Sequence, residues 1–102
     1  MLFLQISKHS PESCPIHHEK HKQATIDLMT KMDRLQAKHG IKEIGSWHSM
    51  PNHTLVAVFD APSLEATQKF VMEPEVMAWL AHNHTEVMPV TTAEEAMKIW
   101  LK

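Results

Sequence analysis

Residues 41–60, IKEIGSWHSMPNHTLVAVFD, predict a β-hairpin and decide the fold class. Residues 41–50 alternate between two faces, as expected of a strand. Residues 54–60 are apolar on both faces, which is typical of a central strand. Pro51 and Asn52 supply the turn between them. Because the connection is short, the two strands are predicted to be antiparallel neighbours.

The segments on either side of the hairpin complete a βαββαβ order. Residues 2–8 alternate with a period of two and predict a first strand. A helix is expected from Ile16 or His18 to His39, where Gly40 ends it. The segments after the hairpin are a helix at 64–72, a short helical segment around 76–80, an edge strand at 84–91 that contains Pro89, and a final helix capped by Thr92. The prediction is one ferredoxin-like α+β domain, residues 1–102, with an antiparallel four-stranded sheet and a C-terminal helix.

Composition excludes several classes of function. The 102 residues carry a net charge of −2 with no basic cluster, so nucleic-acid binding is not expected. No stretch is long and apolar enough to span a membrane. One cysteine excludes an internal disulfide, and the absence of a recognisable export signal leads us to expect a reducing cytoplasm.

The predicted sheet needs cover on both faces. Both main helices of this fold lie on one face. Phe3 and Gln5 are expected on the other face, where a second copy of the chain is the simplest cover. The sequence therefore predicts a homodimer.

Several local motifs resemble the dimeric α+β barrel superfamily, in particular its small, functionally undescribed members. They span nearly the whole chain: His9-Ser10-Pro11-Glu12, Cys14-Pro15, Gly45, His53-Thr54, Phe70-Val71-Met72-Glu73-Pro74 and Glu86-Val87-Met88-Pro89-Val90. A weaker similarity is to small nickel-binding dimers of the same fold. The superfamily also contains cofactor-independent monooxygenases, isomerases and cyclases, so the resemblance implies a scaffold rather than a reaction.

The stretch HSPESCPIHHEKH, residues 9–21, concentrates metal-ligating side chains. His17 and His21 are four residues apart, the spacing that places two imidazoles on one helix face. Cys14 adds a thiolate, and thiolates and imidazoles bind Ni, Zn or Cu. The alternative is that these histidines are a solvated first turn of helix.

Strand order is expected to bring further ligands to the same pole. We expect His9 and Cys14 near Ile41, Asp60 and the pair His82 and His84. The favoured hypothesis is a divalent transition-metal site, used for sequestration, sensing or a simple metal-dependent reaction. The candidate ligands are His9, Cys14, His17, His21, His82 and His84, and no organic cofactor is predicted.

The second hypothesis is a cofactor-independent enzyme of monooxygenase, isomerase or cyclase type. His48 would be the general base because a neutral imidazole titrates near pH 7. Its small apolar substrate would enter a cavity lined by Phe3, Trp47, Val58 and Phe59. His53 is expected beside His48 at the hairpin, at the pole opposite His9. A third, structural interpretation leaves all histidines solvated.

Overall fold

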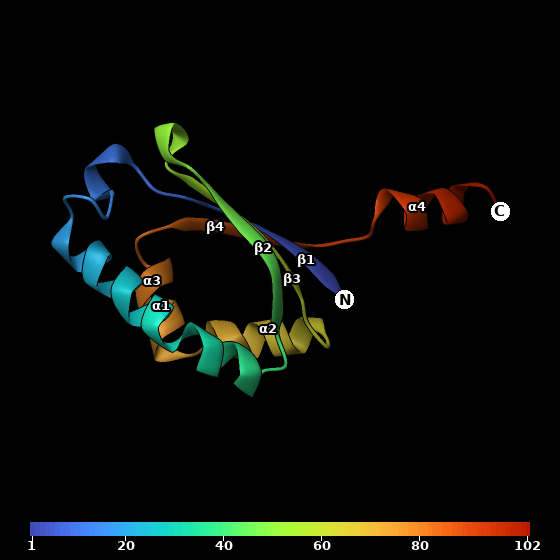
Figure 1. Cartoon of the computed structure of the whole chain (residues 1–102), viewed down its shortest axis with the longest axis horizontal. Helices are drawn as coiled ribbons and strands as arrows, with labels where there is room; N and C mark the ends of the chain where they lie inside the picture. The colour runs from blue at the N-terminus through green and yellow to red at the C-terminus, as the bar shows by residue number, and fades with distance from the viewer.

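The computed structural model describes all residues, 1–102, as one α+β chain (Figure 1). Its elements are β1 (Leu2–Lys8), the 3-10 turn η1 (Pro11–Ser13), α1 (Glu19–Lys38), β2 (Lys42–Ser49), the 3-10 turn η2 (Met50–Asn52), β3 (Thr54–Asp60), α2 (Leu64–Val71), α3 (Pro74–Leu80), β4 (His84–Val90) and α4 (Ala93–Trp100). The predicted βαββαβ order with a C-terminal helix is confirmed.

The four strands form one antiparallel sheet in the order β2-β3-β1-β4. As predicted, β3 is central, and β4, which contains Pro89, is an edge strand. Proline lacks a backbone donor and is tolerated at an edge. Because β1 lies between β3 and β4 and is antiparallel to both, the end of β1 lies beside the starts of these two strands.

Helices α1, α2 and α3 cover one face of the sheet (Figure 1). Phe3 is fully buried there with Ile41 and Ala61. A second cluster, formed by Leu28, Leu35 and Val76, joins α1 to α3. The expectation that Phe3 and Gln5 face away from the helices is therefore wrong. Alternation alone fixes which residues share a face, and the choice of face depends on where the helices pack.

The opposite face of the sheet is open. Directly paired residues share a face, so Leu4, Val58 and Met88 lie together on it. Trp47 pairs with Val56 on the same face and is 60% exposed. The centre of this open face is apolar, Glu86 and Lys8 lie toward one end of it, and no element of the chain covers it.

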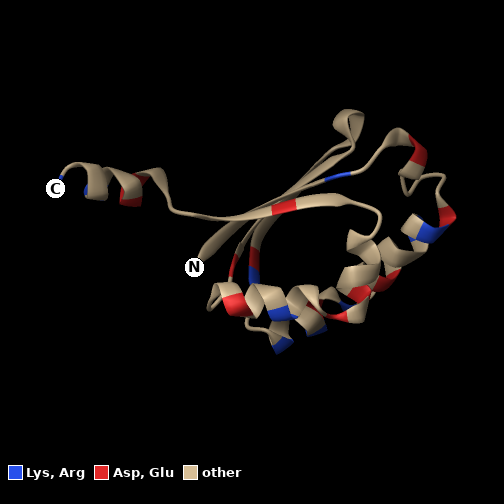
Figure 2. Ribbon diagram, turned by 180° about the vertical axis from the view of Figure 1, so that it is seen from behind, with Lys and Arg blue, Asp and Glu red and all other residues tan.

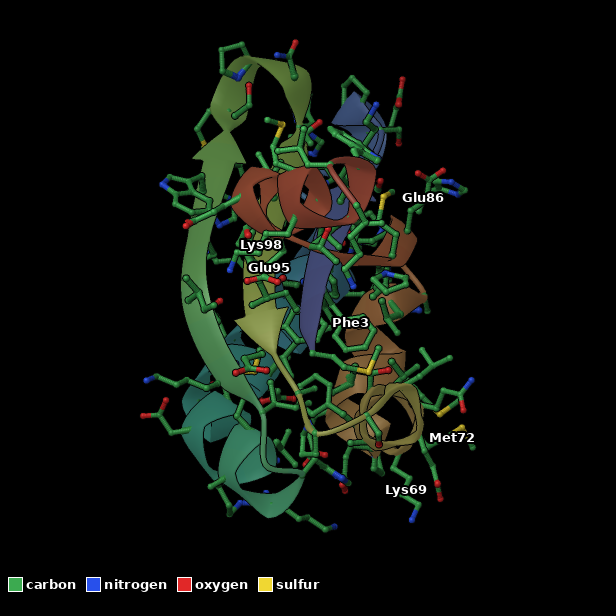
Figure 3. All side chains as sticks on the ribbon, turned by 90° about the vertical axis from the view of Figure 1, so that its right-hand side faces the viewer. Phe3, Lys69, Met72, Glu86, Glu95 and Lys98 are labelled. Carbon is green, nitrogen blue, oxygen red and sulfur yellow. The ribbon has the colours of Figure 1, made fainter.

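Helix α4 lies apart from the rest of the chain, at the end of an extended segment that continues from β4 (Figure 1). None of its residues is buried. Glu95 and Lys98, labelled in Figure 3, pair with each other at 3.3 Å within the helix. Its apolar side chains at Met97 and Trp100 are 49% and 73% exposed.

Charged residues of both signs are interspersed along α1 and α2, the only charged residue of α3 is Glu75, and few charged residues lie on the sheet (Figure 2). This distribution contains no extended basic surface. No helix has the length and apolarity required to cross a bilayer.

Candidate metal centre

Three side chains from separate segments converge where β1 ends. His9 follows β1, Cys14 ends the turn η1, and His53 ends the turn η2. One ligand atom from each lies within 4.8 Å of the other two. We call His9, Cys14 and His53 the thiol–imidazole cluster.

A backbone hydrogen bond holds His9 beside His53. The antiparallel register of β1 and β3 ends at the pair Lys8 and Thr54. One step beyond it, the His9 N–H donates to the His53 carbonyl at 3.2 Å. His53 has a left-handed backbone, with φ of 48°. That conformation is uncommon for non-glycine residues, although histidine is among those enriched in it. The bend directs the chain from η2 into β3 beside His9.

The turn η1 brings the thiol to the same place. The Cys14 N–H donates to the Pro11 carbonyl at 3.3 Å, which closes the turn. The Cys14 residue is 6% exposed. A free buried thiol therefore faces two imidazoles across the end of the sheet.

His9 supplies the unusual feature of the cluster. Its Nε2 atom is buried and has no hydrogen-bond partner. An unpaired buried polar atom costs about 1–3 kcal/mol of stability. Burial lowers the pKa of His9 from its ordinary value of 6.5, and the neighbouring imidazoles of His21 and His53 lower it further, whereas the nearby Asn83 side chain opposes the shift. Its neutral form is therefore favoured, which is the form that binds metal ions.

His21 lies behind the cluster, and its neighbours occupy both of its ring nitrogens. It is 1% exposed, and its ring meets that of His9 edge-on at 5.2 Å between centroids. Its Nδ1 donates to the Ser13 carbonyl. Its Nε2 accepts from the Asn83 amide at 3.2 Å, and the same amide donates to the Trp79 carbonyl at 2.8 Å.

Two further imidazoles, those of His18 and His82, lie beside His21. His18 caps α1 because its Nδ1 accepts from the His21 N–H at 3.1 Å. His82 stacks on His21 at 5.0 Å and meets His18 at 5.3 Å. Burial lowers the pKa of His82, and the neighbouring His21 and His18 add to the effect.

A comparison of the sequence with models of known protein families identifies the family of this chain. The family described as "Domain of unknown function (DUF3303)" matches residues 1–102. The chain belongs to this family. A search of curated proteins found no match to this DUF3303 chain.

Solved structures share its fold at low sequence identity. One is described as "Crystal structure of antibiotic biosynthesis monooxygenase": TM-score 0.57, 12% identity, covering 90% of this chain and 100% of that one. Protein Atu4242 from Agrobacterium tumefaciens is similar with TM-score 0.50 and 11% identity, covering 91% of this chain and 96% of that one. These likenesses confirm the predicted ferredoxin-like α+β fold. The match to a family of unknown function agrees with the predicted resemblance to functionally undescribed members.

Of the six ligands expected from sequence, the structure of the DUF3303 chain brings only His9 and Cys14 into the cluster. His17 is exposed. The His84 side chain is 79% exposed and lies 3.6 Å from Glu86. His21 contacts His9, and His82 stacks on His21, but neither is a member of the cluster.

The third cluster member, His53, is expected from sequence at the opposite pole, and that expectation is wrong. It assumes that β1 and β3 end at the same pole. They are antiparallel, so the end of β1 meets the start of β3, and Asp60 pairs instead with Leu2. The antiparallel hairpin and the strand order contain the signal that could have placed His53 beside His9.

The residues expected at the enzyme site do not meet within a single chain. His48 is an exposed residue on the edge strand β2 and is not enclosed in an apolar cavity. Phe3 pairs with Phe59 on the helix-covered face. Trp47 and Val58 lie on the open face. The four residues predicted to line one cavity are therefore divided between the two faces of the sheet.

Proposed function

We propose that this DUF3303 chain binds one transition-metal ion through His9, Cys14 and His53. The observation that carries the proposal is the buried, unpartnered Nε2 of His9 beside a buried thiol and a second imidazole. A metal ion gives that nitrogen a partner and removes the cost of burying it unpaired. Sequestration, sensing or metal-dependent chemistry would follow from such a site.

The donor set supports this class of ligand. Two imidazoles and one thiolate suit zinc, copper and nickel, and they do not suit magnesium or calcium, which prefer oxygen. Cys14 must lose its proton on binding, so metal affinity falls as the pH is lowered. The site is held by backbone hydrogen bonds from β1, η1 and η2, so its ligands are positioned before the ion arrives.

Equilibrium dialysis of the untagged chain against Ni(II), Zn(II) and copper tests the proposal. We expect one equivalent to bind to the wild type, and Cys14→Ser or His53→Gln to lower the affinity by about tenfold to a hundredfold or more. His84→Gln is the matched control because it removes an exposed imidazole outside the cluster. Equal affinity in Cys14→Ser and wild type would refute this ligand set.

We further propose that a second copy of the chain covers the open face of the sheet. Half-buried Leu4 and Val58 lie on that face beside Trp47, which is 60% exposed, and adjoining exposed apolar side chains of this kind mark interaction surfaces. The unpacked helix α4 is a second apolar element that the same chain leaves without a partner. A symmetric pair would cover both elements by one self-complementary contact.

Sedimentation equilibrium tests this assembly. The expected mass is twice the 11.7 kDa of one chain. Trp47→Glu should yield the single-chain mass because it places a charge in the covered face. Ile26→Glu on α1, at a position 48% exposed, is the control and should stay dimeric. A single-chain mass for the wild type would overturn the proposal.

A further inference from the structure

We infer that the ion held by the thiol–imidazole cluster is copper in its Cu(I) state, bound by three ligands. The inference rests on the proposed metal site and names the metal that this site selects. Zinc needs four ligands, and in structural sites it takes all four from the protein. Soft thiolate donors favour Cu(I), and trigonal sites with two histidines and one cysteine are typical of copper.

The imidazole outside the cluster that meets His9 edge-on is held by hydrogen bonds and is not free to serve as a fourth ligand. His21 meets His9 edge-on, but its Nδ1 donates to Ser13 and its Nε2 accepts from Asn83. Asn83 is itself anchored by its bond to the Trp79 carbonyl. His18 is also committed, because its Nδ1 caps α1. Both ring nitrogens of His21, the imidazole outside the cluster that meets His9 edge-on, are therefore occupied by hydrogen bonds.

Water has limited access to the thiol of Cys14 and to the Nε2 of His9. The Nε2 of His9 is buried, and Cys14 is 6% exposed. Catalytic zinc sites that have three protein ligands keep an open position for water. His9 and His53 are half-buried as residues, so it is the buried thiol and the buried Nε2 of His9 that favour an ion satisfied by three ligands.

Charge balance points the same way. Cu(I) with one thiolate is neutral, whereas Zn(II) with one thiolate keeps a net charge of +1. A buried charge without a partner is costly. The ion pairs that involve histidine join His39 to Glu73 and His84 to Glu86, so no carboxylate pairs with a member of the cluster. The site has no anion other than the thiolate, and it therefore favours the monovalent ion.

The binding step involves no change of oxidation state. The thiol of Cys14 loses its proton to solvent, and its sulfur forms a bond to Cu(I). The neutral imidazoles of His9 and His53 each give a lone pair. One proton is released for each Cu(I) bound.

The test uses the untagged chain under anaerobic conditions, with Cu(I) and Zn(II) as separate probes and in competition. We expect one Cu(I) per chain, with X-ray absorption giving two nitrogen neighbours and one sulfur neighbour. Equimolar Zn(II) should leave the Cu(I) in place. A four-coordinate Cu(I) centre, or displacement of Cu(I) by Zn(II), would overturn the copper inference and leave the metal site standing. Binding of neither ion would overturn the metal site itself.

Asn83→Ala tests whether the Asn83 amide keeps His21 from acting as a fourth ligand. Removing the amide frees the Nε2 of His21, so Zn(II) affinity should rise by about tenfold. His84→Gln is the control and should leave Zn(II) affinity unchanged. Unfolding by urea checks that each variant is folded. A folded Asn83→Ala chain with unchanged Zn(II) affinity would contradict the role assigned to Asn83.

Discussion

Replacing His9 by leucine should separate two effects on stability: the loss from burying an unpaired nitrogen and the gain from binding metal. The Nε2 atom of His9 is buried without a hydrogen-bond partner. Leucine has a similar volume and contains no polar atom, so it removes that cost. It also removes one of the three proposed ligands. The variant should therefore be more stable than wild type without metal and should gain nothing when metal is added.

The expected sizes follow from these two effects. Burying an unpaired polar atom costs about 1–3 kcal/mol. The loss of the edge-on contacts of His9 with His21 and His53, each with ring centroids 5.2 Å apart, offsets part of the gain. A net increase of about 1 kcal/mol in the metal-free free energy of unfolding is expected. For the wild type, metal at a hundred times its dissociation constant should add about 2.7 kcal/mol.

Urea unfolding followed by circular dichroism measures both effects. Each protein is unfolded after exhaustive chelation and again with added metal. The reasoning is refuted if metal-free His9→Leu is less stable than metal-free wild type by more than about 1 kcal/mol. It is also refuted if added metal stabilises the variant as much as the wild type.

Three further predictions concern stability and use the same urea assay on metal-free protein. Leu35→Ala should lower the free energy of unfolding by about 2–5 kcal/mol because Leu35 is 1% exposed in the helical core, and a loss below about 1 kcal/mol would show that the site is not packed as described. Ser63→Ala should cost about 1 kcal/mol because its side chain accepts from the Ala66 N–H at the start of α2, and no change would argue against the cap. Burial and neighbouring imidazoles lower the pKa values of His9 and His82 in the folded chain. The unfolded chain therefore takes up protons first, so stability should hold above pH 7 and fall as the pH drops below about 6.5. Equal stability at pH 7.5 and pH 5.5 would contradict the pKa shifts.

Most of the fold could be predicted from local patterns. The hairpin at residues 41–60 and the proline in β4 report which strands are neighbours and which is an edge, because these patterns reflect backbone bonding. The face on which Phe3 lies could not be predicted in the same way. Alternation gives two sets of residues, and only the packing of the helices decides which set is covered.

The site could be predicted in part for a comparable reason. His9 and Cys14 lie near one another in the sequence and end adjacent segments, so their proximity could be predicted from the sequence. His53 required the correct strand direction. The burial of His21 depends on the Ser13 carbonyl and on Asn83, which is 62 residues away along the chain. Such hydrogen bonds leave no periodic signal in the sequence.

Native mass spectrometry of the untagged chain, with elemental analysis of the same sample, tests the central claim most directly. The account predicts one metal ion per chain in wild type and in His84→Gln, and none in Cys14→Ser. A wild-type chain that takes up no metal from a solution containing it, or a Cys14→Ser chain that keeps its full equivalent, would contradict the account.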